Sequence, residues 1–229
     1  RAGRVTADQW SVANSGDYSS ALGYNCTASG DYSFSAGYLN VSSGLYSVSL
    51  GRSLIALGSD SVATGYLCEA NGAQSFATGN RNVASGNYSS VFGRENTVGE
   101  YATSFGYQNT SSGNQSVTFG RGNVSLGNFS TILGGQYNTS CYQAIAGGQY
   151  NSDSGSNTVW VDTDPLFTLG NGTSDVARSN AFVVYKNGNV DVNGDLDVTG
   201  ILTMGTLVMP TKASTGDSAS PVEGQIYNN

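Results

Sequence analysis

The hydrophobic and polar residues of this chain follow a fourteen-residue period, divided into two halves that each begin with glycine. In the first half of each unit, small residues alternate with larger apolar ones over about five positions, as in Ser75, Phe76 and Ala77. Successive side chains of a β-strand point to opposite faces. The alternation therefore predicts short strands with one small-residue face and one bulky face, neither of them charged.

Glycine recurs at every seventh residue and marks the expected turns between these strands. Because glycine has no Cβ to obstruct a sharp bend, we expect structural turn glycines in a coil that repeats every fourteen residues. After Gly93 the next glycine, Gly99, follows six residues later instead of seven. The seven-residue spacing then continues to Gly155, and Cys141 is at the one position of this second run that lacks glycine. The first run is uninterrupted and comprises Gly16, Gly23, Gly30, Gly37, Gly44, Gly51, Gly58, Gly65, Gly72, Gly79, Gly86 and Gly93.

A seven-residue period also occurs in coiled coils, but the residue types here exclude that fold. Coiled-coil heptads need large aliphatic residues at two positions and strong helix formers elsewhere. Glycine instead fills one place in seven, at a cost of about 1 kcal/mol each in a helix. Charged residues make up only 11% of the chain. We therefore predict an all-β fold, a parallel β-roll or β-solenoid with 14-residue turns.

Both faces of the predicted strands lack charged residues and are expected to be buried, but a single narrow coil can bury only one of them. The small-residue face suits a thin core inside the coil, although the pattern alone leaves open which face points inward. The bulky face then needs cover, and the sequence offers no helices to supply it. Further copies of the same chain are the simplest cover, so we expect a homotrimeric fibre.

Composition divides the chain into five expected segments. After the repeat, residues 159–161, 164–169 and 181–185 have the composition of strands, and Asn187–Gly188 is a hairpin turn signal. Glycines then recur every six residues, which predicts a narrower stalk. The segments are an N-terminal lead-in from a longer chain (1–15), the 14-residue-repeat β-roll of about ten turns (16–155), a β neck (156–187), a six-residue-period β-stalk (188–209), and a linker to an absent C-terminal part (210–229).

Charge and composition exclude several functions. The net charge of −7 argues against nucleic acid as a partner, and no apolar run reaches the roughly 18 residues that a membrane span needs. The chain has no histidine, the commonest general base and a common zinc ligand. We therefore predict no enzyme activity, no catalytic residue, no metal site and no cofactor.

Acidic residues are further candidates for metal ligands, and cysteines for disulfide bonds. Asp162 with Asp164 suggests calcium ligands, as do Asp191, Asp195 and Asp197, but aspartate also suits turns and strand ends, which is the interpretation we prefer. Cys26 and Cys68 occupy the same place three turns apart, about 14 Å by strand spacing. That separation is too long for a disulfide within one chain. We expect buried thiols, with an interchain bond near a trimer axis as the alternative.

Tyrosines recur at two fixed places of the repeat. One hypothesis is an aromatic ladder that stiffens the coil. The other is a repetitive surface for glycans or a host receptor, since aromatic faces suit sugar rings. Arg52, Arg94 and Arg121 share the ninth place with some of these tyrosines. The candidate receptor- or glycan-binding residues are Tyr18, Tyr32 and Tyr46 at the third place and Tyr24 and Tyr38 at the ninth place.

The S-x-A-x-G motif of residues 61–65 and 75–79 resembles the head repeats of YadA-like trimeric adhesins. The resemblance covers residues 16–155 and implies a left-handed parallel β-roll packed three together. This chain uses Tyr, Asn and Phe where those heads prefer Ala, Val and Ile. The C-terminal residues 167–172, 179–190 and 221–227 look instead like segments of phage and viral tail fibres.

These observations predict a structural and adhesive trimeric fibre. Our first expectation is a phage or viral tail fibre or spike on the virion surface, involved in host-cell attachment through a host surface glycan or protein receptor. One alternative is the head domain of a bacterial trimeric surface adhesin on the bacterial cell surface. Another is the non-catalytic shaft of an enzyme-bearing fibre.

Overall fold

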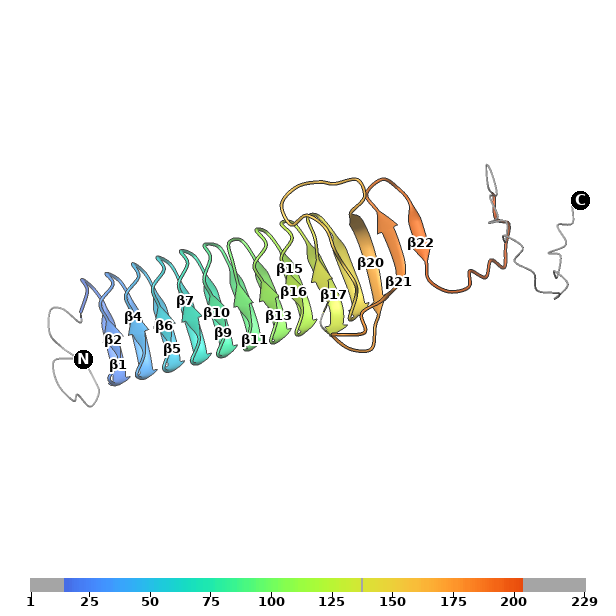
Figure 1. The fold of residues 1–229 in the computed structure, drawn as a ribbon. Coiled ribbons are helices and arrows are strands. Elements are labelled where there is room, and N and C mark those ends of the chain that lie inside the picture. The colour runs from blue at the N-terminus through green and yellow to red at the C-terminus, as the bar shows by residue number, and fades with distance from the viewer. Residues whose placement is uncertain (1–14, 137, 204–229) are drawn as a thin grey trace, which may run out of the picture. The chain divides into compact units, whose positions relative to one another are not determined.

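The computed structural model describes residues 15–136 and 138–203, and every regular element in them is a β-strand (Figure 1). The chain forms two units, residues 1–195 and 196–229, and all the strands belong to the first. In the described residues, no helix is long and apolar enough to cross a membrane. The expected all-β fold is thus confirmed.

Each repeat unit contributes one longer strand, and each except the last, 141–154, also contributes one two-residue strand; like strands stack in parallel, as Figure 1 shows. Partners lie one repeat apart, so Ala63 pairs with Ala77 and Gly65 with Gly79. The predicted parallel β-solenoid is therefore confirmed. The longer strands are β1 (Ser20–Tyr24), β3 (Phe34–Tyr38), β5 (Val48–Arg52), β7 (Val62–Tyr66), β9 (Phe76–Asn80), β11 (Ser90–Arg94), β13 (Thr103–Tyr107), β15 (Val117–Arg121), β17 (Thr131–Gln136) and β19 (Ile145–Gln149). The short strands are β2 (Thr27–Ala28), β4 (Val41–Ser42), β6 (Ile55–Ala56), β8 (Glu69–Ala70), β10 (Val83–Ala84), β12 (Thr97–Val98), β14 (Thr110–Ser111), β16 (Val124–Ser125) and β18 (Thr139–Ser140).

The structure settles which strand face points inward. Small residues at the fourth and sixth places, such as Ser75 and Ala77, are buried inside the coil. The larger residues between them, such as Phe76, lie on the outer face and are half-buried. Because mostly alanine and serine side chains fill the coil interior, the two stacks of strands lie close together.

A column of buried asparagines also runs through the coil, at the eleventh place of the repeat, or one place later at Asn138. The Asn96 Nδ2 donates to the carbonyl oxygens of Phe92 and Gly106, at 2.9 and 2.8 Å. Its Oδ1 accepts the backbone N–H of Asn109 in the next turn, at 2.8 Å. The Asn96 amide thereby pairs with backbone groups of its own turn and of the next. The column comprises Asn40, Asn82, Asn96, Asn109, Asn123, Asn138 and Asn151.

The glycines stand at the expected turns, and close approach of neighbouring turns is a second reason for them. A Cβ on Gly58 would lie 1.8 Å from the carbonyl oxygen of Gly72. Positive φ angles occur at eighth-place glycines, such as Gly37 (φ 128°), and at non-glycine residues two places after a glycine, such as Tyr32 (φ 57°) and Leu39 (φ 56°). Glycine therefore makes room for the next turn at both places of the repeat, and at the eighth place it also takes a backbone conformation that other residues rarely adopt.

The strands after the solenoid close its C-terminal edge. β20 (Pro165–Asn171) pairs in parallel with β19, and β21 (Asn180–Tyr185) and β22 (Val190–Val192) follow in antiparallel order. The β21–β22 hairpin turns at Gly188, where Asn187–Gly188 predicted it. An antiparallel hairpin here ends the run of parallel pairing.

Two expectations for this region differ from the structure or reach beyond it. Residues 159–161 form a loop rather than the expected strand, because the Ser156 hydroxyl and Asp162 bind this segment locally: Ser156 Oγ accepts the Val159 N–H and Asp162 accepts the Trp160 indole N–H. In the described part of the expected stalk, 188–203, the only strand is β22. The remaining stalk residues, the C-terminal linker and residues 1–14 of the lead-in lie outside the described residues.

Candidate functional site

The third-place tyrosines form an exposed stack along the turn that precedes each longer strand. The ring centroids of Tyr18 and Tyr32 are 5.1 Å apart with planes inclined by 10°, and those of Tyr32 and Tyr46 are 5.0 Å apart. Each ring face therefore contacts the next ring. Tyr18, at the end of the stack, is 82% exposed, whereas at Tyr32, between two rings, a ligand meets the ring edge and hydroxyl group rather than a face.

The ninth-place residues form a second column that mixes aromatic rings with guanidinium groups. Tyr24 and Tyr38 stack with their centroids 4.9 Å apart. The Arg52 guanidinium then lies between Tyr38 and Tyr66, at 5.6 and 5.2 Å from the two ring centroids. Stacking on aromatic rings holds an arginine in place while its N–H edge stays available.

The same arrangement recurs further along the coil in inverted form. Tyr107 lies between Arg94 and Arg121, whose guanidinium carbons are 5.3 and 5.5 Å from its ring centroid. The sequence already placed these arginines at the ninth place. The alternation of ring and cation depends on the in-phase pairing of successive turns, for example of Arg94 with Tyr107.

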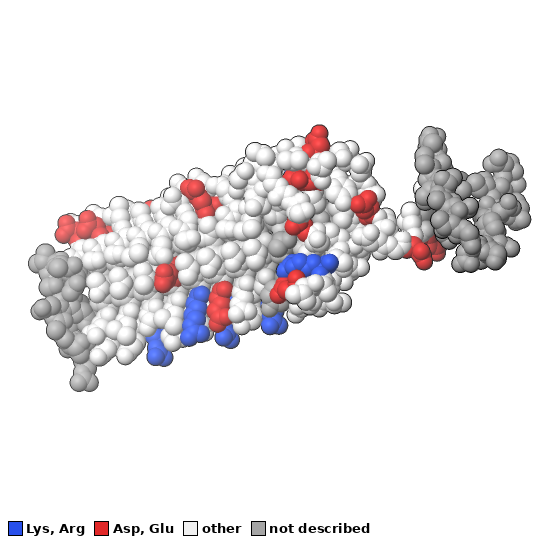
Figure 2. All heavy atoms as spheres, in the orientation of Figure 1, with Lys and Arg blue, Asp and Glu red and all other residues white. Residues whose placement is uncertain are grey.

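Positive charge gathers where the longer strands end, a region that we call the arginine edge. It comprises Arg52, Arg81, Arg94 and Arg121. Figure 2 shows Lys and Arg side chains in a row along one edge of the solenoid, with acidic side chains among them. Glu95 pairs with Arg94 at 2.9 Å and lies 3.7 Å from Arg81, and the hydrogen bond from Arg94 lowers the pKa of Glu95. These pairs are exposed and contribute little to stability.

The outer face of the longer strands forms an apolar surface, which we call the apolar sheet face. Phe92, Phe105 and Phe119 stack on it with ring centroids 4.6 and 4.9 Å apart. Large exposed apolar patches usually mark sites of association. The face is built from fifth- and seventh-place residues, chiefly Leu22, Phe34, Val48, Leu50, Val62, Phe76, Phe92, Phe105, Val117, Phe119, Leu133 and Ile145.

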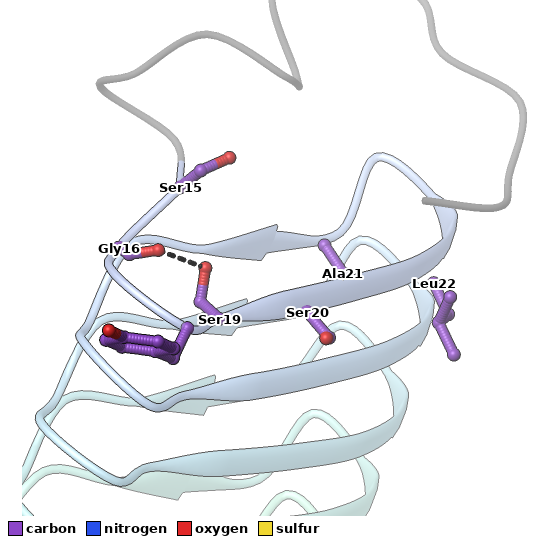
Figure 3. A pocket seen from close by; sticks show the side chains of 7 residues that line it. Ser15, Gly16, Ser19, Ser20, Ala21 and Leu22 are labelled. Atoms are coloured by element: carbon purple, nitrogen blue, oxygen red, sulfur yellow. Dashed lines mark hydrogen bonds between the residues drawn. The ribbon is translucent and has the colours of Figure 1, made fainter.

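A hollow of about 280 Å³ lies at the first described turn, lined by residues that include Tyr18 and Leu22 (Figure 3). Ser19 Oγ donates to the Gly16 carbonyl oxygen there, at 2.8 Å. The lining residues carry no carboxylate, thiol or basic side chain. This hollow offers hydroxyl groups and apolar surface but no acid–base chemistry.

The candidate metal ligands and cysteines have other surroundings. In the described residues, no group of three metal-ligating side chains comes together. Asp162 accepts the Trp160 indole N–H at 2.8 Å, and Asp191 accepts the Tyr185 hydroxyl at 2.8 Å. The three cysteines are buried thiols, and burial raises the pKa of Cys141 to about 12.

Comparison with known proteins adds one family match. The family model of the YadA head domain repeat, which spans two copies of the repeat, matches residues 15–40, 28–53, 70–96 and 98–123. No curated protein matches the chain. The matched segments all lie in the solenoid, so the resemblance of the C-terminal residues to tail fibres is not confirmed.

Proposed function

We propose, from the premise that its solenoid is built of YadA-like head repeats, that this chain is the head segment of a trimeric adhesin displayed on a bacterial cell. A β-solenoid of such repeats is a structural and adhesive architecture. The family match favours this alternative over our first expectation, a tail fibre on a virion. None of the matched segments supports a tail fibre.

The apolar sheet face carries the proposal of a trimer. Phe119 and Leu133 are exposed on it although they are large and apolar. Three copies around an axis would bury this face along the length of the solenoid, at roughly 25 cal/mol for each Å² of apolar surface removed from water. The arginine edge, with its charged groups, would stay in contact with solvent.

The two tyrosine columns and the arginine edge are the proposed contact surface for a host. They present hydroxyl groups, ring edges and guanidinium N–H groups at a repeat of about 4.8 Å, the spacing of stacked strands. A periodic ligand such as a glycan chain would meet the same group on several turns. Repeated weak contacts add up to firm attachment when they act together.

Sedimentation equilibrium and a glycan array test the two parts of this proposal. We expect a particle of three times the chain mass, and array signals that fall when Tyr32 is replaced by alanine. Leu57→Ala, an exposed substitution outside both columns, is the matched control. A monomer at micromolar concentration contradicts the trimer. A trimer that binds no glycan and no host-cell protein contradicts the adhesive role of these columns.

A further inference from the structure

A buried lysine and a buried aspartate face each other where the solenoid meets its C-terminal strands. Asp164 directly precedes β20 and Lys186 directly follows β21. The backbone N–H of Lys186 donates to the carbonyl oxygen of Asp164 at 3.0 Å, and that of Asn187 donates to the Asp162 carbonyl oxygen at 2.9 Å. These bonds fix the two residues opposite each other at the ends of neighbouring strands.

The Lys186 ammonium is poorly solvated for a charged group. Its side chain is 0% exposed, and in the described residues its Nζ has no hydrogen-bond partner. The Tyr142 and Trp160 rings flank it at 5.6 and 5.1 Å from Nζ to the ring centroids. Cation–π contacts offset only part of the cost of burying a charge.

The only carboxylate within ion-pair distance of this lysine in the described residues belongs to Asp164, with 3.8 Å between Nζ and Oδ2. The same Oδ2 accepts the Ser156 backbone N–H at 2.9 Å. Gly155 packs against the carboxyl group, since a Cβ there would lie 2.8 Å from Asp164 Cγ. The carboxyl group is therefore held in place rather than free to turn toward solvent.

A second buried acid belongs to the same cluster. Asp153 accepts the Cys141 backbone N–H at 3.1 Å, while its Oδ1 has no partner in the described residues. Burial raises the pKa of Asp153 to about 6, and the charges of Asp164 and Lys186 both act on it. The cluster thus contains an acid that exchanges its proton near neutral pH.

We propose that Lys186 and Asp164 condense to an intramolecular amide, an isopeptide bond between Nζ and Cγ. A proton first passes from the ammonium to the carboxylate, which leaves a neutral amine and a neutral acid. The Nζ lone pair attacks Cγ and forms the C–N bond. The Cγ–OH bond then breaks, and the hydroxyl group leaves as water with one proton from Nζ. The reaction needs no oxidant or co-reactant.

The bond would change how the end of the fibre bears load. It would join the residue before β20 to the residue after β21, so tension arriving through residue 187 would pass directly to residue 164. The β20–β21 pair would then be excluded from the path of the force. This inference does not depend on the adhesive role, because any stretched fibre would gain from it.

The intact mass of the purified full chain tests the proposal. We expect a mass lower than the sequence mass by one water, and a proteolytic fragment in which the peptides of Lys186 and Asp164 are joined. Lys186→Arg keeps the positive charge and should restore the full mass. Asp162→Asn, next to the site, should keep the loss. A wild-type mass equal to the sequence mass overturns the proposal, and so does a loss of water that persists in Lys186→Arg.

Discussion

At the scale of the residue, the asparagine column shows that this coil is stabilised by polar groups inside it as well as by small apolar ones. The buried Asn96 amide, for example, bonds to backbone groups of its own turn and of the next. The column was not anticipated because Cys26, Leu54 and Cys68 take the same place in three turns and hide the pattern. The asparagine at that place in most turns was the signal that could have revealed it.

Replacing Asn96 with alanine should destabilise the protein. The substitution leaves the carbonyl groups of Phe92 and Gly106 and the N–H of Asn109 without their partner. Buried polar groups left unpaired cost about 1–3 kcal/mol each, so for three groups we expect a loss of at least about 3 kcal/mol in the free energy of unfolding. Chemical denaturation measures it. The exposed Gln108→Ala is the control, and equal stability of the two variants would contradict this role.

Asp153 should give the stability a pH dependence. Its pKa is raised to about 6 from 3.8, so between pH 4 and 6 the native state binds more protons than the unfolded state. The free energy of unfolding should therefore fall as pH rises through this window, by at most about 3 kcal/mol, and stay level above it. Denaturation curves at pH 4 and pH 7 should differ less for Asp153→Asn than for wild type. The exposed Asp60→Asn should behave like wild type, and a wild-type pH dependence in Asp153→Asn would refute the assignment.

At the scale of the element, the alternation of small and large residues predicted the solenoid strands correctly. Where a segment of strand composition is not a strand, the reason is that it has no neighbouring strand to pair with. Residues such as Ser75, Phe76 and Ala77 predicted both the strand and its two unlike faces. Residues 159–161 have strand composition but lie in a loop held by Ser156 and Asp162. The residue pattern of one segment shows only whether it can form a strand. Whether it does so also depends on a neighbouring strand with which it can pair.

Two glycine substitutions separate backbone strain from collision between turns. Gly65 has φ +100°, and a Cβ there would lie 2.2 Å from the Gly79 carbonyl oxygen. Gly188 has φ +88° with no atom near its Cβ position. Gly188→Ala should cost about 1–2 kcal/mol, the strain alone. Gly65→Ala should cost clearly more, or prevent folding. Thermal unfolding compares them, and equal losses would show that close approach of the turns is unimportant.

At the scale of the whole molecule, most of what the sequence could not decide concerns association. The repeat predicted a dry outer face, and the structure places Phe92, Phe105 and Phe119 on it. A single chain contains no information about the sister copies that would cover this face, beyond the need for cover. The ring-and-guanidinium columns were visible as places in the repeat, but their stacking followed only from the register of the turns.

A charge in the middle of the apolar sheet face should break the proposed trimer. Phe105→Asp places a carboxylate among the stacked rings, where burial against sister chains would be very costly. We expect sedimentation equilibrium to report monomers or unstable small oligomers for this variant. Ser112→Asp adds the same charge at an exposed position outside that face and should remain trimeric. A stable Phe105→Asp trimer would place the interface elsewhere.

The in-phase register of the turns makes this protein extensible by whole units. Duplicating one fourteen-residue segment, such as 99–112, would insert a complete extra turn between existing ones and leave every column continuous. Each insertion would move the distal end outward by about 4.8 Å. The number of repeats in the gene therefore works as a ruler, setting how far from its base the fibre reaches, without any change in what its surface presents.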